Sequence, residues 1–266
     1  MSARRTAVRI PALAYADDAA LMSDNGEAAQ RQLQRFETAS AKVGLRLNAG
    51  KTEVMFVGDT PPMDINTTTG VTLAVWDDFC YLGCDVADRT RAFQRRRRIA
   101  WVAARKLTVV WNSTVSDGAK MQLFKATVES VLLYSCEALA VTDTLGNRID
   151  ASHRALMRYC LGVHYPERLS NENLYARALI VPATLTLTRS RLRLVGHALR
   201  RPDLPLAVFL NPQNQATEPY RRGGALHRTY QAQFIDDLNA IGLQLDAAVD
   251  AAQDRTEWQR RVKALK

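Results

Sequence analysis

The sequence predicts an α+β fold, with short strands and one helix in the first third of the chain and helices in the rest. Short apolar runs separated by turn residues fill the chain as far as residue 86, which is typical of strands and hairpins. From about Thr90, apolar residues recur at the helical period of three to four. Residues 202–224 are rich in Pro, Asn, Gln and Gly and predict a linker or extended loop. We therefore divide the chain into residues 1–86, 87–165 and 166–266.

A hairpin is predicted at ALAYADDAALMS, residues 12–23. Apolar runs at Ile10 to Tyr15 and Ala19 to Met22 flank the adjacent pair Asp17 and Asp18. The structural interpretation is a turn, because an Asp carboxylate accepts hydrogen bonds from nearby backbone N–H groups. The functional interpretation is an oxygen-rich site of the kind that Mg²⁺ prefers. The motif alone leaves both interpretations open.

The rest of the first third should contain one helix and several short strands. The helix is predicted from Asp24 to Val43 behind a cap-like Asp-Asn-Gly-Glu start, and Gly44 should end it. Extended segments are expected at residues 45–47, 52–57, 71–75 and 79–82, the last two forming a strand pair across residues 76–78.

Three amphipathic helices with short loops are predicted next, and they would form a small bundle. The first should bury the stripe Ile99, Ala103, Leu107 and Val110. The second should run from Ser116 to about Ala140, and the third from about Gly146 to Leu161 with Gly162 as its terminator. A helix over 184–200 and two or three short helices would follow.

The chain carries a formal net charge of +9, which indicates a polyanionic partner. Two basic runs contain no acidic residue: Arg89–Lys106 has eight basic residues and Arg189–Arg201 has five. Nucleic acid is the partner that explains this positive charge most simply. A membrane surface is the second choice, because the flanking helices lack the Trp- or Phe-rich apolar face that inserts into lipid.

The cysteines and the N-terminus point to a reducing, intracellular location. Cys80, Cys84, Cys136 and Cys160 fit neither a disulfide framework nor a zinc ribbon. A zinc site using Cys160 and nearby histidines is the less favoured alternative to buried thiols. No apolar run approaches the roughly 20 residues of a membrane span, and the first residues lack a signal-peptide core. We expect a nuclear or cytoplasmic protein of unspecified oligomeric state.

Several motifs, taken in order, resemble the reverse transcriptases of non-LTR retrotransposons. Tyr15-Ala-Asp-Asp18 resembles their metal-binding motif, and Phe79-Cys-Tyr-Leu-Gly83 is similar to their primer-grip hairpin. The segment Gly44-Leu-Arg-Leu-Asn-Ala-Gly-Lys-Thr-Glu53 resembles the next palm motif of the family. The basic helix, followed by Lys120 and the run Val131–Glu137, resembles the thumb. Two segments, Arg193–His197 and Asp254–Trp258, resemble elements found downstream of the thumb. The likeness covers nearly the whole chain and implies a partial palm, a helical thumb and a helical C-terminal region.

The resemblance implies roles for four groups of residues. Asp17 and Asp18 would be Mg²⁺ ligands for two-metal nucleotidyl transfer, and Lys51 would protonate the pyrophosphate leaving group. Phe79, Tyr81, Leu82 and Gly83 would press on the primer end. Arg91, Arg95, Arg98 and Arg105 would track the phosphates of an RNA template or RNA–DNA duplex. The structural alternatives are a solvated loop lysine, an ordinary core hairpin and a solvated helix face.

The sequence departs from the family in one important respect. The family's palm needs a further catalytic Asp on an earlier strand, but only sixteen residues precede Asp17 and none is acidic. The fingers and first palm half are also absent, so we expect weak Mg²⁺ binding and no activity by this portion alone, with dNTP used only by the intact enzyme. Three interpretations follow: part of an RNA-directed DNA polymerase, a catalytically silent nucleic-acid-binding protein, or a relic without selected function.

Overall fold

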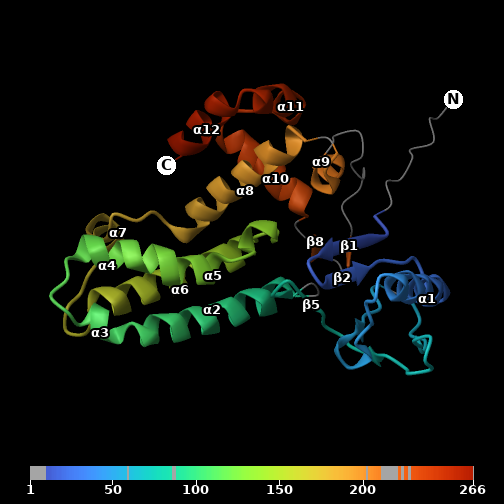
Figure 1. Ribbon diagram of the computed structural model, residues 1–266. Helices are drawn as coiled ribbons and strands as arrows, with labels where there is room; N and C mark the ends of the chain where they lie inside the picture. The colour runs from blue at the N-terminus through green and yellow to red at the C-terminus, as the bar shows by residue number, and fades with distance from the viewer. Residues whose placement is uncertain are drawn as a thin grey trace. The chain divides into compact units, whose positions relative to one another are not determined.

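The computed structural model divides into two compact units, Met1–Asp88 and Arg89–Lys266 (Figure 1). Each sheet among the described residues has two strands, and helices make up most of the second unit, so the fold is of the mixed α+β kind. The structure describes residues 10–58, 60–85, 88–201, 203–210, 221–222, 225–226 and 229–265.

The first unit opens with the predicted hairpin. Strands β1 (Ala12–Tyr15) and β2 (Asp18–Leu21) pair antiparallel, with Tyr15 opposite Asp18. The loop is therefore only two residues long. Its first residue, Ala16, has a φ of 53°, the positive sign that tight hairpin turns of type II′ require at this position.

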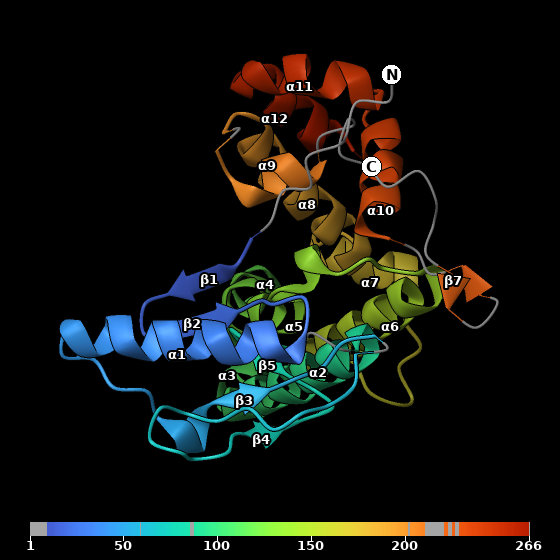
Figure 2. The same ribbon diagram turned by 90° about the vertical axis from the view of Figure 1, so that its right-hand side faces the viewer.

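Helix α1 (Gly26–Lys42) lies against the hairpin (Figure 2). It begins one residue after Asn25, whose side chain accepts a hydrogen bond from the backbone N–H of Ala28, and Gly44 follows it with a φ of 79°. Gln32 donates through Nε2 to the Pro11 carbonyl at 2.6 Å, at the base of the hairpin. The small core of this unit consists of Leu33, Ile65 and Leu73, with partly buried neighbours.

Strand pairing in the rest of this unit differs from the prediction. The remaining elements are η1 (Ala49–Lys51), β3 (Glu53–Val54), β4 (Ala74–Val75), β5 (Cys80–Tyr81) and β6 (Cys84–Asp85). Strand β4 pairs in parallel with β3, and β5 pairs antiparallel with β6, so the expected pairing of 71–75 with 79–82 is wrong. The two-residue turn after β5 explains this, because Leu82 and Gly83 both have positive φ, as type I′ hairpin turns require. The segment 45–47 is not a strand.

The second unit begins with a helical bundle in which α2 packs along α5 and α6 (Figure 1). Its elements are α2 (Arg89–Lys106), α3 (Thr108–Trp111), α4 (Asp117–Phe124), the π-helical turn η2 (Lys125–Glu129), α5 (Ser130–Leu133), η3 (Cys136–Ala138) and α6 (Asp143–Leu161). The helix expected to reach Ala140 ends at Leu133, because Ser135 adopts a left-handed conformation with a φ of 62°. Gly162 ends α6 with a φ of 70°, as predicted.

The buried stripe of α2 is not the predicted one. The buried residues are Ala92, Phe93, Ala100 and Ala104, whereas Ile99 is 41% exposed and Ala103 is only half-buried. Three of the four are alanines, whose small side chains let the neighbouring helices approach closely. Leu107 and Val110 lie beyond the end of α2 and are half-buried.

The C-terminal part of the second unit surrounds α8. Its elements are α7 (Asn171–Ala178), α8 (Ala183–Leu199), α9 (Pro205–Leu210), β7 (Arg221–Arg222), β8 (Ala225–Leu226), α10 (Tyr230–Ala240), α11 (Leu245–Gln253) and α12 (Arg255–Ala264). The predicted linker 202–224 contains α9 and β7, and its residues 202, 211–220 and 223–224 lie outside the described residues.

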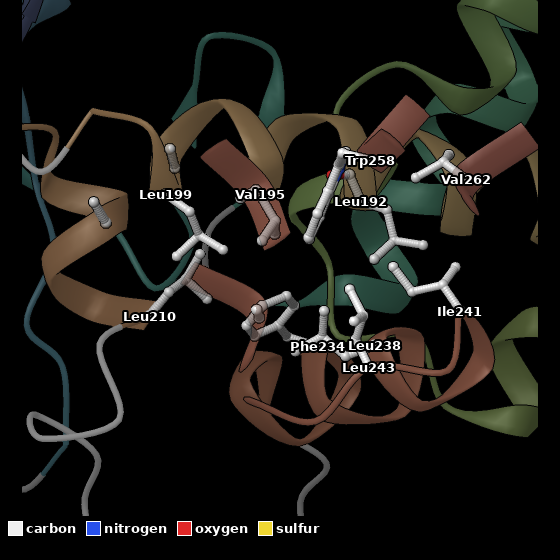
Figure 3. Packing of buried hydrophobic residues seen from close by; sticks show 14 residues of the cluster. Leu192, Val195, Leu199, Leu210, Phe234, Leu238, Ile241, Leu243, Trp258 and Val262 are labelled. Carbon is white, nitrogen blue, oxygen red and sulfur yellow. The ribbon is translucent and has the colours of Figure 1, made fainter. Parts of the chain in front are cut away.

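Figure 3 shows the apolar core between α8, α10 and α12. Trp258 is almost fully buried, and its indole Nε1 donates to the Leu192 carbonyl at 2.8 Å. Gly196 lies directly under the Trp258 ring. Each large apolar side chain buried in this way contributes about 1.5–3 kcal/mol, so this core is a main source of the second unit's stability.

Candidate nucleic-acid interface and carboxylate hairpin

The hairpin exposes both carboxylates at its tip. Asp17 is the second turn residue, Asp18 is the first residue of β2, and both side chains are exposed. The positive φ of Ala16 allows the chain to reverse within two residues, which brings adjacent Asp residues to one end of the hairpin. Among the described residues no group of three or more His, Cys, Asp or Glu side chains is placed to hold a metal ion.

Lys51 is an exposed residue at the end of η1. The turn that carries it is fixed locally, because the Asn48 carbonyl accepts hydrogen bonds from the Lys51 N–H at 3.0 Å and from the Thr52 hydroxyl at 2.9 Å. In the described part of the chain, Lys51 forms no ion pair with Asp17 or Asp18. The catalytic roles of these three residues stay a prediction.

The primer-grip-like segment is a hairpin with an aromatic pair on one side. The rings of Phe79 and Tyr81 stack with centroids 6.3 Å apart and an interplanar angle of 14°. Leu82 and Gly83 form the turn, and Leu82 is 37% exposed. Such a half-buried aromatic pair beside a tight turn can offer a flat apolar contact.

Helix α2 presents the predicted arginines on the side opposite its buried stripe. Arg91, Arg95, Arg98 and Arg105 are all exposed. Arg91, Arg98 and Arg105 are spaced by seven residues, which is about two helical turns, and the set extends over about 21 Å at 1.5 Å per residue. Arg97 and Lys106 are exposed as well. Since α2 contains no acidic residue, this face carries only positive charge, with the exposed Val102 between Arg98 and Arg105.

Two other basic residues of α2 hold the helix in the bundle. Arg89 donates through Nη1 to the Ala140 carbonyl at 2.8 Å, and the Arg96 guanidinium lies 4.1 Å from the centroid of the Tyr134 ring. A cation over an aromatic ring is worth about 0.5–2 kcal/mol. In the sequence all eight basic residues of this helix look alike. Arg89 and Arg96 differ from the other six only in the structure, where they are half-buried.

Several arginines of the second basic run contact other parts of the fold. Arg191 forms a buried ion pair with Asp237 at 2.6 Å. Arg189 and Arg200 donate to the carbonyls of Leu265 at 2.6 Å and Ala252 at 2.9 Å. Arg201 pairs with Asp203 at 2.9 Å, and the pKa of the Asp203 carboxyl is lowered by its hydrogen bond to that guanidinium. Arg189, Arg191 and Arg200 therefore supply structural contacts, whereas Arg193 is exposed.

A further buried polar pair supports the bundle behind α2. His153 on α6 is fully buried, and its Nε2 lies 3.0 Å from Glu129 Oε1. The π-helical turn η2 ends at Glu129 and adds a residue to that helix turn. Sequence reasoning had considered His153 only as a partner for a zinc ion. A buried glutamate on a neighbouring helix is not visible in local sequence patterns.

The membrane question has a direct structural answer. In the described part of the chain, no helix combines the length and apolar character that crossing a bilayer requires.

Two motifs behind the family resemblance meet in space. Gly196 belongs to the segment Arg193–His197, and Trp258 closes the segment Asp254–Trp258. A Cβ atom on Gly196 would lie 2.3 Å from Trp258 Nε1, so the glycine leaves room for the indole. Asp254 caps α12, since its Oδ1 accepts from the N–H groups of Thr256 and Glu257. These motif residues therefore have a packing role.

Comparison with known proteins gives one similarity. No protein-family model matches the chain, and no solved structure matches it. A Caenorhabditis elegans protein described as uncharacterized and transposon-derived is 26% identical, and the match covers 92% of each chain. This similarity suggests that the present chain also has a transposon origin.

Proposed function

We propose that this chain derives from a non-LTR retrotransposon reverse transcriptase and binds RNA or RNA–DNA duplex through the exposed arginine face of α2. The observation that carries the proposal is that face, with Arg91, Arg95, Arg98 and Arg105 opposite a buried alanine-rich stripe. The similarity to a transposon-derived protein and the order of the palm and thumb motifs support the retroelement part.

The face suits a phosphate backbone for physical reasons. Arginine presents a planar fork of N–H donors that binds phosphate oxygens at two points. One face about 21 Å long can follow several consecutive phosphates. Arg89 and Arg96 attach the helix to the rest of its unit, so the exposed arginines stand on a fixed support.

The competing interpretation is that the arginine face of α2 only contacts water. The contacts made by arginines of the second basic run argue against it. In the second basic run, arginines find carboxylate or carbonyl partners within their own unit. Among the described residues, no carboxylate lies within ion-pair distance of Arg97, Arg98 or Lys106. Neighbouring positive charges repel one another, and a polyanion would relieve that repulsion.

Polymerisation by this portion alone is not part of the proposal. Mg²⁺ would stabilise the attacking and leaving oxygens of nucleotidyl transfer, and Asp17 and Asp18 would be its ligands here. Two exposed carboxylates without a third ligand among the described residues do not fit a complete metal centre. In an intact enzyme, Lys51 would donate a proton to the leaving pyrophosphate and the hairpin at Phe79–Gly83 would contact the primer end, with dNTP as substrate.

Salt dependence of binding tests the proposal. Neutralising phosphates releases counterions, so affinity should fall steeply as salt rises. Changing Arg91, Arg95 and Arg98 to Gln should flatten the slope of log K against log salt by about 2–3, if each arginine neutralises one phosphate. Binding would be measured by fluorescence anisotropy with a labelled RNA–DNA duplex across a salt series.

A matched variant separates this face from total charge. Changing the exposed residues Arg255, Arg260 and Lys263 of α12 to Gln removes the same number of positive charges from another helix. The slope should then stay close to that of the unmodified chain. Equal slopes for all three proteins would show that the α2 face is only a solvated surface.

Primer extension tests the catalytic part separately. The purified chain should add no nucleotide above background with Mg²⁺ or Mn²⁺. Templated incorporation that Asp17→Asn abolishes would contradict this expectation, and it would leave the binding proposal unaffected.

A further inference from the structure

The segment Val131–Glu137, which resembles part of the family's thumb, exposes an aromatic side chain on an anchored stretch of backbone. Tyr134 directly follows α5 and is 50% exposed. Leu133 before it and Cys136 after it are both buried. Between them, Ser135 has a left-handed backbone with a φ of 62°, which is uncommon for residues other than glycine. The chain therefore holds Tyr134 at the surface between two positions that are fixed in the core.

The guanidinium of Arg96 covers one side of the Tyr134 ring. Its central carbon lies 4.1 Å from the ring centroid, well within the range of a cation–π contact. Because this contact covers one side, the exposed half of Tyr134 belongs mainly to the other side and to the edge of the ring. Arg96 is itself half-buried and belongs to α2, which packs along α5 (Figure 1). A flat aromatic surface is thus open to solvent on a cationic support.

This aromatic surface borders the arginine face of α2. Arg95, one of the exposed arginines of that face, directly precedes Arg96. Successive residues of an α-helix are rotated by about 100°, so the two side chains leave α2 on neighbouring sides. Basic side chains beside an exposed aromatic ring are the combination by which proteins hold single-stranded nucleic acid, the cations on the phosphates and the ring on a base.

We propose that Tyr134 stacks on an unpaired base of the nucleic acid whose phosphates contact the arginine face. This inference rests on the proposed function, because it needs the strand to lie along α2. Stacking is tolerant of sequence, since every base has a π-face. Inside a duplex the neighbouring base pairs cover both faces of each base. The ring therefore selects a single-stranded segment, either alone or as an overhang next to a duplex.

The contact divides the work between the two side chains. Arg96 keeps the ring in place and adds positive charge beside it, while the Tyr134 ring supplies the surface on which the base lies. The tyrosine hydroxyl and the 2′-hydroxyl of the nucleic acid take no part in stacking. RNA and DNA overhangs should consequently gain equally from Tyr134, whatever their sequence.

Fluorescence anisotropy with two labelled ligands tests the proposal on the full-length chain. One ligand is a blunt RNA–DNA duplex, and the other is the same duplex with a single-stranded overhang. Tyr134→Ala should weaken binding of the overhang ligand by about 5- to 150-fold, the loss typical of one stacked base, and leave the blunt duplex unchanged. The slope of log K against log salt should stay the same, because the substitution removes no charge. Tyr134→Phe should bind as the unmodified chain does.

Matched controls separate stacking from a general loss of surface. Tyr165→Ala removes a tyrosine that is 89% exposed in the loop after α6, and it should leave binding of both ligands unchanged. An overhang of the same length without bases should bind the unmodified chain and Tyr134→Ala equally. Far-UV circular dichroism checks that each variant is folded. Equal weakening of Tyr134→Ala on normal and base-free overhangs would overturn the proposal.

A tryptophan at the same position reports the contact directly. Tyr134→Trp should keep the affinity for the overhang ligand, and its added fluorescence should be quenched by that ligand but not by the base-free one. The chain already contains four tryptophans, so the signal is the difference from the unmodified chain. Equal quenching by free adenosine monophosphate would overturn the assignment to a nucleic-acid strand.

Failure of this inference is distinct from failure of the proposed function. Unchanged affinity of Tyr134→Ala for the overhang ligand, with salt-dependent binding intact, would overturn the stacking contact and leave the arginine face standing. Absence of binding to either ligand would overturn both.

Discussion

Replacing Asp237 with Asn should destabilise the second unit strongly, because the substitution leaves Arg191 buried without its counterion. Both side chains are 5% exposed, and the carboxylate accepts from Nε at 2.6 Å and from Nη2 at 3.0 Å. Removing one partner of such a buried pair costs about 3–5 kcal/mol, whereas most exposed pairs contribute about 0–1 kcal/mol. We expect a loss of that size, since Gln233 also loses its carboxylate acceptor.

Urea unfolding followed by far-UV circular dichroism would measure the loss, with the transition of the second unit fitted separately because the chain has two units. The matched control is Asp203→Asn, which breaks the exposed pair with Arg201 and should leave the midpoint unchanged. The double variant Arg191→Met with Asp237→Leu should recover most of the stability, because apolar residues of similar volume often replace buried ion pairs without loss. A loss below about 1 kcal/mol for Asp237→Asn would refute the reasoning.

Three further predictions concern packing, pH and the hairpin. Gly196→Ala should destabilise the second unit by about 1–3 kcal/mol, since the new Cβ would overlap Trp258, while Gly118→Ala has open space and should be tolerated in the same unfolding assay. Burial raises the pKa of the Cys160 thiol from 9.0 to about 12, so the protonated thiol favours the folded state; its contribution should be full below pH 9 and fall by about 1.4 kcal/mol per pH unit up to 12. Cys160→Ala should make the fall in stability shallower by that amount and leave the part due to Tyr230, whose pKa burial also raises to about 12. Ala16→Gly should relieve the positive φ and increase hydrogen-exchange protection in β1 and β2, and unchanged protection would show that the turn is unstrained.

Local signals predicted the first hairpin turn and two helix ends, whereas the helix end expected near Ala140 and the strand pairing of residues 71–75 were wrong. The YADD hairpin and the ends at Gly44 and Gly162 follow from residues adjacent in sequence, whose backbone preferences act locally. The partner of β4 is β3, about twenty residues earlier, and two-residue strands carry no pattern that specifies such a partner. The hairpin at Phe79–Gly83 was expected only from the family resemblance, because leucine rarely adopts the positive φ that Leu82 has in the turn.

Basic residues were predicted correctly to be exposed only where no residue from a distant part of the sequence contacts them. The arginines chosen on α2 are exposed, because a run without acidic residues offers them no ion-pair partner within their own helix. The run at Arg189–Arg201 looks similar in sequence, yet Arg191 finds Asp237, which is 46 residues away. Only the tertiary fold places that carboxylate.

The two units differ in how well they can hold a functional geometry. The core of the first unit is small, built around Leu33, Ile65 and Leu73, and isolated two-stranded sheets are only marginally stable. The second unit buries a much larger apolar cluster around Trp258 and supports α2 through Arg89 and Arg96. A metal centre needs its ligands fixed within a fraction of an ångström, whereas binding a phosphate backbone tolerates mobile side chains. The proposed nucleic-acid contact therefore lies on the well-packed unit and does not depend on the chemistry of the hairpin.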